Sequence, residues 1–261
     1  MNNTVLITGA SSGIGQAFAS VFASHGYNLV LVARNEARLN TVAAVIRRDF
    51  MVATTVIVKD LGAVTAAQEL FDETIARGLQ IDILINNAGA GVGGNFIDNT
   101  LNDELAVIQL NVITVAALCH LFGTAMANRQ AGRILNVASI AAFLPGPLMA
   151  NYYASKAYVL QLSVALRCEF KHLGVTVTTL CPGPTQTELF SRSGMATARA
   201  ANGLRMQTAE QVAVIGYLAL MRGKGVVVTG VTNKLLAFLT RLAPRSLLAS
   251  IARAANAKHP Y

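Results

Sequence analysis

The chain has 261 residues, 53% of them hydrophobic, and a formal net charge of +8. This length allows one large α/β domain or two small ones, and one is expected because no linker or internal repeat interrupts the chain. The first ten residues lack the basic start and long apolar core of a secretory signal. Cys119, Cys168 and Cys181 are widely spaced in apolar contexts, which predicts buried thiols in a reducing compartment. We therefore expect a cytoplasmic protein.

The positive charge is concentrated near the C-terminus. Glu210 is the last acidic residue, and the basic residues beyond it are Arg222, Lys224, Lys234, Arg241, Arg245, Arg253 and Lys258. Because no nucleic-acid-binding motif accompanies these cations, a nucleic-acid partner is not expected.

The chain begins with a strand-like run over residues 4–8, followed by a glycine-rich turn and a helical pattern to about residue 25. The turn reads Gly9-Ala10-Ser11-Ser12-Gly13-Ile14-Gly15. Backbone N–H groups of such a turn can approach a pyrophosphate at the positive end of the helix. The spacing differs from the usual G-x-G-x-x-G, and a tight turn without a ligand is the alternative.

A second strand is expected over residues 28–33, and the residue after it bears on the cofactor. In dinucleotide folds an acidic residue near this place binds the adenosine ribose, whereas an arginine accommodates a 2′-phosphate. Arg34 stands here, so NADP is predicted unless Arg34 is only a solvated residue at a helix start. Asp60, after a third strand at 52–58, either caps the next helix or contacts the adenine.

The alternation of strands and helices continues along the chain. Helices are expected near 36–48, 65–77, 152–172 and 209–221, and strands at 81–85, 133–137, 175–180 and 226–229. Residues 105–128 contain no Asp, Glu, Lys or Arg and are long enough to span a membrane. Polar residues interrupt this run, so a buried helix of the domain is favoured.

One stretch, residues 139–156, carries a candidate acid–base pair. Tyr152 and Lys156 stand four residues apart at a helix start, so both project from one face. An ammonium about 6 Å from a phenol, at an effective dielectric near 20, stabilises the phenolate by roughly 3 kcal/mol and lowers the tyrosine pKa by about two units. Ser139 precedes the turn-rich 144–147, which can fold its hydroxyl back to the tyrosine. A bare Y-x-x-x-K is common by chance, so this pair needs support from the rest of the chain.

That support comes from several motifs in a fixed order. TGASSGIG at 8–15, NNAG at 86–89, Asn111, Ser139, YYASK at 152–156 and Pro-Gly at 182–183 resemble the short-chain dehydrogenase/reductase family, in its NADP-type bacterial oxidoreductases. The correspondence covers nearly the whole chain. It implies a single Rossmann-like, doubly wound parallel sheet flanked by helices over residues 1–230, with 231–261 as a basic amphipathic extension of the same domain.

The resemblance also implies a catalytic tetrad of Asn111, Ser139, Tyr152 and Lys156. In it, NADPH gives a hydride to the carbonyl carbon of the substrate while Tyr152 protonates the carbonyl oxygen, and Ser139 holds that oxygen. Lys156 lowers the tyrosine pKa and binds the nicotinamide ribose, and Asn111 organises a water that relays protons to Lys156. Tyr153 can also reach Lys156, but the family's twelve-residue spacing from Ser139 selects Tyr152.

The cofactor contacts implied by the resemblance form a larger set. They are Gly9, Ser11, Ser12, Gly13, Ile14, Gly15, Arg34, Asp60, Leu61, Asn87, Ala88, Gly89, Tyr152, Lys156, Pro182, Gly183, Thr185 and Thr187. Many NADP-preferring members carry a second basic residue where this chain has Ser12, so a modest preference for NADP is expected. No metal is expected.

The expected reaction is hydride transfer between NADP(H) and a carbonyl or alcohol, in a homodimer or homotetramer. An apolar small-molecule substrate is expected from the residues that should flank the nicotinamide: Ala90, Val92, Phe96, Ala141, Phe143, Leu144, Leu148 and Met149. One alternative is reduction of a 3-oxoacyl thioester, which needs the arginines of a candidate lid over 187–208, Arg192, Arg199 and Arg205, as a basic landing site. Another is a non-catalytic NADP(H)-binding sensor or scaffold.

The C-terminal extension combines leucines at roughly helical spacing with cations and no acidic residue. A basic amphipathic helix can lie on an anionic membrane surface. Packing of these leucines over the cleft or against a partner subunit is favoured, and peripheral membrane contact stays open.

Overall fold

The structure, a computed structural model, describes residues 3–195 and 206–257. Its centre is a parallel seven-stranded sheet in the order β3-β2-β1-β4-β5-β6-β7. The strands are β1 (Thr4–Thr8), β2 (Asn28–Ala33), β3 (Thr54–Val58), β4 (Ile83–Asn86), β5 (Gly132–Val137), β6 (Val175–Cys181) and β7 (Val226–Val228). Each predicted strand is present with its ends within two residues of expectation.

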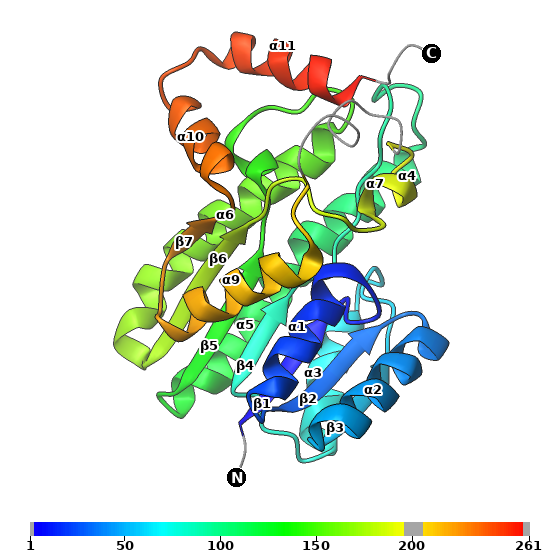
Figure 1. Cartoon of the computed structure of the whole chain (residues 1–261), viewed down its shortest axis with the longest axis vertical. Coiled ribbons are helices and arrows are strands. Elements are labelled where there is room, and N and C mark those ends of the chain that lie inside the picture. The colour runs from blue at the N-terminus through cyan, green and yellow to red at the C-terminus, as the bar shows by residue number, and fades with distance from the viewer. Residues whose placement is uncertain (1–2, 196–205, 258–261) are drawn as a thin grey trace.

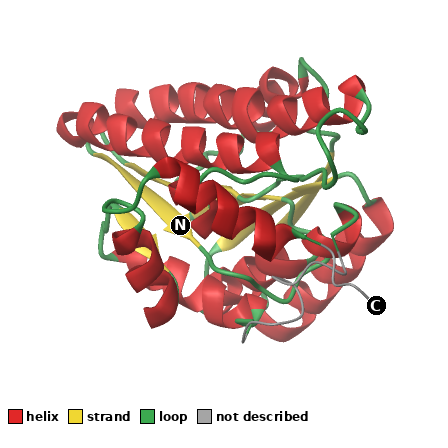
Figure 2. Ribbon diagram, turned by 90° about the horizontal axis from the view of Figure 1, so that it is seen from above, coloured by secondary structure: helices red, strands yellow, loops and turns green. Residues whose placement is uncertain are grey.

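Helices cover both faces of the sheet (Figures 1 and 2). They are α1 (Gly13–Ser24), α2 (Glu36–Phe50), α3 (Ala66–Ala76), α4 (Leu101–Ile108), α5 (Thr114–Asn128), α6 (Ala150–Phe170), α7 (Leu189–Arg192), α9 (Ala209–Met221), α10 (Val231–Leu239) and α11 (Arg245–Asn256). One face packs against α1, α2 and α9, and the other against α3, α5 and α6. The predicted doubly wound α/β architecture is therefore confirmed.

The strand order reverses beside β1, because β2 and β3 lie on one side of β1 and β4 to β7 on the other. In open parallel sheets, ligands bind outside the carboxyl ends of the strands at such a switch point. The loops after β1 and β4 meet there, so the topology places the glycine-rich turn and the NNAG segment at one edge of the sheet.

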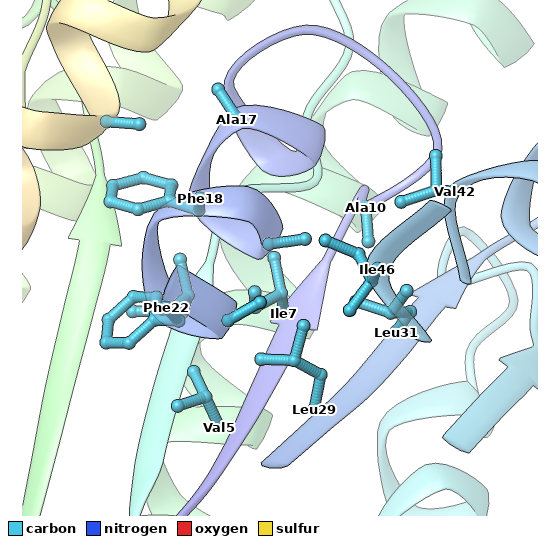
Figure 3. Close-up of a cluster of buried hydrophobic side chains, with 14 of the residues drawn as sticks. Val5, Ile7, Ala10, Ala17, Phe18, Phe22, Leu29, Leu31, Val42 and Ile46 are labelled. Atoms are coloured by element: carbon cyan, nitrogen blue, oxygen red, sulfur yellow. The ribbon is translucent and has the colours of Figure 1, made fainter. Parts of the chain in front are cut away.

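Between the sheet and α1 lies the first hydrophobic core, part of which Figure 3 shows. Phe18 and Phe22 of α1 are fully buried, and the ring of Phe22 meets Tyr27 and Tyr217 edge-on at centroid distances of 5.4 and 5.2 Å. Tyr217 belongs to α9, so this aromatic cluster joins the first and last thirds of the chain.

The charge-free run at 105–128 is part of a longer helical segment, Leu101–Asn128, which by length and composition alone could cross a membrane. It packs into the fold through Leu118, Phe122 and Met126, which are buried in the second core cluster. It is not one regular helix, because a π-turn, Gln109–Ile113, separates α4 from α5. Sequence periodicity did not predict this turn.

Two of the three cysteines are buried, as predicted, and one is not. Burial raises the pKa of the Cys119 thiol to about 11 and that of Cys181 to about 12, so both are neutral and inert. Cys168 is exposed, and the expectation for it was wrong. It lies near the end of α6, beyond the last buried residue of that helix, Ser163.

The aromatic cluster gives a direct test of core packing. Phe22→Ala should lower the free energy of unfolding by about 3–5 kcal/mol, because the ring's contacts and its buried area are both lost. Urea unfolding followed by circular dichroism measures this, with Val64→Ala at an exposed position as the control. A loss for Phe22→Ala no larger than that of the control would contradict this packing.

Candidate active site

The glycine-rich turn is shaped by close backbone approach. Gly9 has φ +66°, a conformation that favours glycine, and a Cβ on Gly15 would strike the carbonyl oxygen of Gly9. Asn87 Nδ2 donates to the backbone carbonyl oxygen of Thr8 at 2.9 Å, and this bond joins the turn to the loop after β4. The backbone N–H groups of Asn87 and Ala88 donate to Thr8 Oγ1 at 2.9 and 3.0 Å. Asn87 and Ala88 therefore hold the turn in place.

The start of α1 fits a pyrophosphate. No side chain caps this helix, so its first N–H groups are not satisfied by Ser12, and no acidic residue lies in its first turn. A Cβ added to Gly13 would lie 3.1 Å from Thr187 Cγ2, so Thr187 stands over the turn. The cradle of small residues matches the dinucleotide role predicted for it.

Arg34 and Asp60 lie together after β2 and β3. Arg34 Nη1 and Asp60 Oδ2 are 3.9 Å apart, with 69% and 60% of these side chains exposed. Asp60 Oδ1 accepts from the N–H of Gly62, and the N-cap of α3 is Thr65. Asp60 therefore does not cap α3, and of its two expected roles only the adenine contact stays a prediction.

The other predicted cofactor positions lie at the same edge of the sheet. Leu61, Ala88, Gly89, Pro182, Gly183 and Thr185 are in the loops that follow β3, β4 and β6. A Cβ on Gly89 would meet Asn111 Oδ1 and Lys156 Nζ, each at 3.3 Å. Two members of the predicted tetrad thus converge on the NNAG loop.

Ser139 folds back to Tyr152 as predicted. Its hydroxyl accepts from the N–H of Ala141 at 3.1 Å and so caps a short 3-10 helix, Ile140–Phe143. A hydrogen bond also joins the Ser139 and Tyr152 side chains. The next backbone N–H, that of Ile140, donates to the Pro182 oxygen at 2.8 Å. Ser139 and Tyr152 are therefore held together by loops after β5 and β6.

Lys156 lies beside Tyr152, but the predicted effect on the tyrosine pKa is wrong for the free protein. Lys156 Nζ lies 5.8 Å from the centre of the Tyr152 ring. Burial nevertheless raises the pKa of Tyr152 to about 12, and the hydrogen bond from Ser139 opposes this only in part. Burial also lowers the pKa of Lys156 to about 8. Desolvation of the buried phenol outweighs the effect of the neighbouring positive charge here.

Asn111 lies in the π-turn and is almost fully buried, with 1% of its surface exposed. Its side chain accepts from the N–H of Ala90 at 2.9 Å and donates to the carbonyl of Ala90 at 2.8 Å. It also donates to Ser155 Oγ at 3.0 Å, and Ser155 Oγ in turn donates to the backbone carbonyl oxygen of Tyr152 at 2.7 Å. Single π-helical turns of this kind recur at functional sites. Asn111 therefore positions the loop and the tyrosine, and its role in a water relay stays a prediction.

The neighbouring Tyr153 points to a different partner. Its hydroxyl donates to Asn256 Oδ1 at 3.1 Å, and Asn256 Nδ2 donates to the Pro147 oxygen at 2.9 Å. Tyr153 thus joins α6 to α11, and the choice of Tyr152 as the acid–base residue agrees with this geometry.

An apolar cluster surrounds the tyrosine. Ala141, Met149 and Met195 are buried with Tyr152, and Leu189 packs against them. Ala141 and Met149 were predicted here, whereas Phe143 packs against the second core cluster and lines a groove beside α10. Met195 and Ser155 were not predicted. The YYASK motif contains Ser155, but Met195 follows a stretch of weak periodicity that offers no signal.

Part of the candidate lid is described. The backbone N–H of Gln186 donates to the Gln207 oxygen, so the two ends of this segment lie side by side. Glu188 forms ion pairs with Arg38 and Arg192, and Arg38 Nη1 lies 2.9 Å from Glu188 Oε2. Arg199 and Arg205 lie outside the described residues. The arginine that is described, Arg192, is therefore already paired.

A family model described as short chain dehydrogenase matches residues 3–197. The chain belongs to this family. The resemblance found in the motifs is thereby confirmed at the level of the family, while its bacterial branch stays a prediction.

Among characterised relatives, the very-long-chain 3-oxoacyl-CoA reductase of Anas platyrhynchos is 34% identical over 190 residues, covering 70% of this chain and 60% of the relative. The 17-beta-hydroxysteroid dehydrogenase type 3 of Mus musculus is 34% identical over 194 residues, covering 72% and 62%. The chain thus spans a little under two thirds of the length of these relatives.

Solved structures agree over most of the chain. The short-chain dehydrogenase of Sphingobium yanoikuyae, in complex with NADPH, has a TM-score of 0.83 at 31% identity, covering 92% of this chain and 93% of that one. The protein of Burkholderia phymatum, in complex with NAD, has a TM-score of 0.82 at 28% identity, covering 91% and 92%.

The buried ammonium predicts a pH-dependent stability. The folded pKa of Lys156 lies below its ordinary 10.5, so the folded chain holds this proton more weakly than the unfolded chain. The resulting destabilisation is complete below pH 8 and disappears as the pH rises toward 10.5. A shift to about 8 corresponds to about 3 kcal/mol.

Lys156→Met should therefore be inactive yet more stable than wild type at pH 7, by up to about 3 kcal/mol, with the gap narrowing by pH 9.5. Urea unfolding at both pH values measures this, and Lys171→Met at an exposed site should show no such trend. A variant less stable than wild type at pH 7 would show that the Lys156 contacts outweigh its desolvation.

Proposed function

We propose that this protein is an NADP(H)-dependent oxidoreductase that interconverts a carbonyl compound and its alcohol. The observation that carries the proposal is the buried Tyr152, hydrogen-bonded to Ser139 and 5.8 Å from the Lys156 ammonium. When bound, the nicotinamide cofactor supplies the hydride. The chain supplies the proton, the oxyanion contact and the positive charge.

In the direction of reduction, Tyr152 gives its hydroxyl proton to the substrate oxygen while the carbonyl carbon gains the hydride. The alcohol forms with one proton and one hydride added. A tyrosine with a pKa raised to about 12 is protonated at neutral pH and so has a proton to give in this direction. Ser139 holds the developing negative oxygen, and Lys156 stabilises the tyrosinate that remains. In oxidation these roles reverse.

An apolar substrate is supported by the side chains around the tyrosine. Ala141, Met149 and Met195 are all buried beside Tyr152. The compartment, the cytoplasm, and the homodimeric or homotetrameric state expected from the sequence remain part of the proposal.

A 3-oxoacyl thioester is the second candidate substrate, favoured by the relative from Anas platyrhynchos, a very-long-chain 3-oxoacyl-CoA reductase. The basic landing site expected for it is weakened, because Arg192 is paired with Glu188.

The preference for NADP rests on Arg34. Arg34 is 69% exposed and lies 3.9 Å from Asp60, and an exposed pair of this kind contributes little to stability. A 2′-phosphate can therefore replace Asp60 as the partner of Arg34 at small cost, gaining charge-assisted hydrogen bonds.

The reaction is tested by following NADPH absorbance with a panel of apolar ketones and aldehydes, a small charged ketoacid, and a long-chain 3-oxoacyl-CoA. Wild type should turn over the apolar carbonyls, the acyl-CoA or both. Tyr152→Phe should lose at least a hundredfold in kcat while NADPH binding survives, because only the proton donor is removed. Tyr153→Phe should keep most activity. Activity on the charged ketoacid alone, or an inactive Tyr153→Phe that is folded, would contradict the proposal.

Cofactor choice is tested by the dissociation constants of NADPH and NADH. Arg34→Ala should weaken NADPH binding by about ten- to a hundredfold, which corresponds to the roughly 1.5–3 kcal/mol of a charge-assisted contact, and leave NADH binding nearly unchanged. Arg48→Ala, which removes an exposed cation on α2 that also pairs with an aspartate, is the matched control. If the ratio of the two constants does not move, Arg34 does not read the phosphate.

A further inference from the structure

One face of α10 carries large apolar side chains that the fold leaves in solvent. Val231, Leu235 and Phe238 follow one another at helical spacing, and Leu242 continues the row in the turn after the helix. Their exposed fractions are 81, 58, 57 and 72%. Ala237, on the other side of the helix, is buried and meets the body of the protein. Most of the row therefore faces away from the core, and Phe238 also borders the groove between α10 and the body of the protein.

The helix that follows is built in the same way. Leu248 and Ala252 of α11 are buried, whereas Leu247 and Ile251 are 52% and 55% exposed. In Figure 1, α10 and α11 stand together at the top of the molecule, beyond the carboxyl ends of β6 and β7. We call their outward apolar side chains the tail surface: Val231, Leu235, Phe238, Leu242, Leu247 and Ile251.

Cations accompany the tail surface. Lys234 and Arg241 of the α10 region, and Arg245 and Arg253 of α11, are all exposed. Within residues 3–195 and 206–257 none of these four forms an ion pair, and the chain has no acidic residue after Glu210. Exposed aliphatic side chains and unpaired cations thus share one end of the molecule.

The charges decide between two possible occupants. A symmetric contact between two copies through this surface would bring four cations of one copy against four of the other, with no carboxylate between them. An anionic lipid bilayer satisfies both features, because aliphatic side chains enter the acyl boundary while lysine and arginine reach the headgroups. We propose that the tail surface docks on an anionic lipid bilayer.

The docked face would adjoin the active site. Asn256 at the end of α11 bonds to the oxygen of Pro147 and to Tyr153, which stands next to Tyr152. A bilayer against the outer side of α11 would lie beside the loop that leads into the apolar cluster around Tyr152. Delivery of an apolar carbonyl compound from the bilayer follows from this placement. That last step rests on the proposed function, whereas the docking itself does not.

The test is sedimentation of the full-length protein with vesicles. Wild type should sediment with mixed phosphatidylcholine and phosphatidylglycerol vesicles and stay in solution with phosphatidylcholine alone. Binding should fall as salt rises, because the screening length shortens from about 8 Å at physiological ionic strength to about 3 Å at 1 M. Turnover of a soluble carbonyl is measured in parallel, so a failure of the proposed reaction is seen separately.

Two pairs of substitutions locate the contact. Lys234→Gln with Arg241→Gln should lower the partition coefficient by about fivefold per cation removed. Leu235→Gln with Phe238→Gln should lower the partition coefficient by more than tenfold, because the two apolar side chains that would enter the bilayer are lost. The matched controls, Lys171→Gln with Arg48→Gln and Val64→Gln with Ile75→Gln, are exposed positions away from the tail and should bind like wild type.

Three outcomes would overturn the proposal. The first is wild-type protein that ignores anionic vesicles even at low salt. The second is equal binding to neutral and anionic vesicles. The third is a change in molar mass in light scattering for the Leu235→Gln, Phe238→Gln variant without vesicles, which would show that a second copy covers the surface.

Discussion

The burial of the Lys156 ammonium is the constraint on which the active site depends. Only 6% of Lys156 is exposed, and its Nζ donates to the Val137 oxygen at 2.9 Å. A buried cation is costly unless it is hydrogen-bonded, so this bond ties α6 to the end of β5. Tyr152 lies one turn earlier on α6 and is fixed by the same contact. The protein thus accepts a local loss of stability to place a positive charge beside a phenol.

The loops around this pair are held by backbone contacts. The Asn111 side chain hydrogen-bonds both the N–H and the carbonyl of Ala90. The Asn87 side chain donates to the carbonyl oxygen of Thr8, and the N–H of Ile140 donates to the carbonyl oxygen of Pro182. Each bond joins the loop after one strand to another element near the same edge of the sheet. Because these groups are buried or half-buried, breaking one bond leaves an unsatisfied polar atom, which keeps the site rigid before any ligand binds.

The contacts proposed for the cofactor phosphate and for lipid have a different energetic character. Arg34 and Asp60 are mostly exposed, and so are the cations of α10 and α11. Such charges contribute little to folding and cost little to rearrange. The buried residues of the candidate site are therefore held rigidly within the fold, whereas the proposed recognition of phosphate groups depends on solvated side chains at its rim.

Much of the fold and of the candidate site could be predicted from the sequence alone. The alternation of strands and helices, the glycine-rich turn and the Ser139, Tyr152 and Lys156 spacing depend on local patterns, and the structure places all three residues together. The tertiary structure decided what depends on distant neighbours. Desolvation raises the pKa of Tyr152, whereas charge alone would lower it. Asn256 accepts a hydrogen bond from Tyr153, and Met195 packs against Tyr152 from a segment of weak periodicity. Burial and long-range contacts set these outcomes, and neither is encoded in the spacing of residues along the chain.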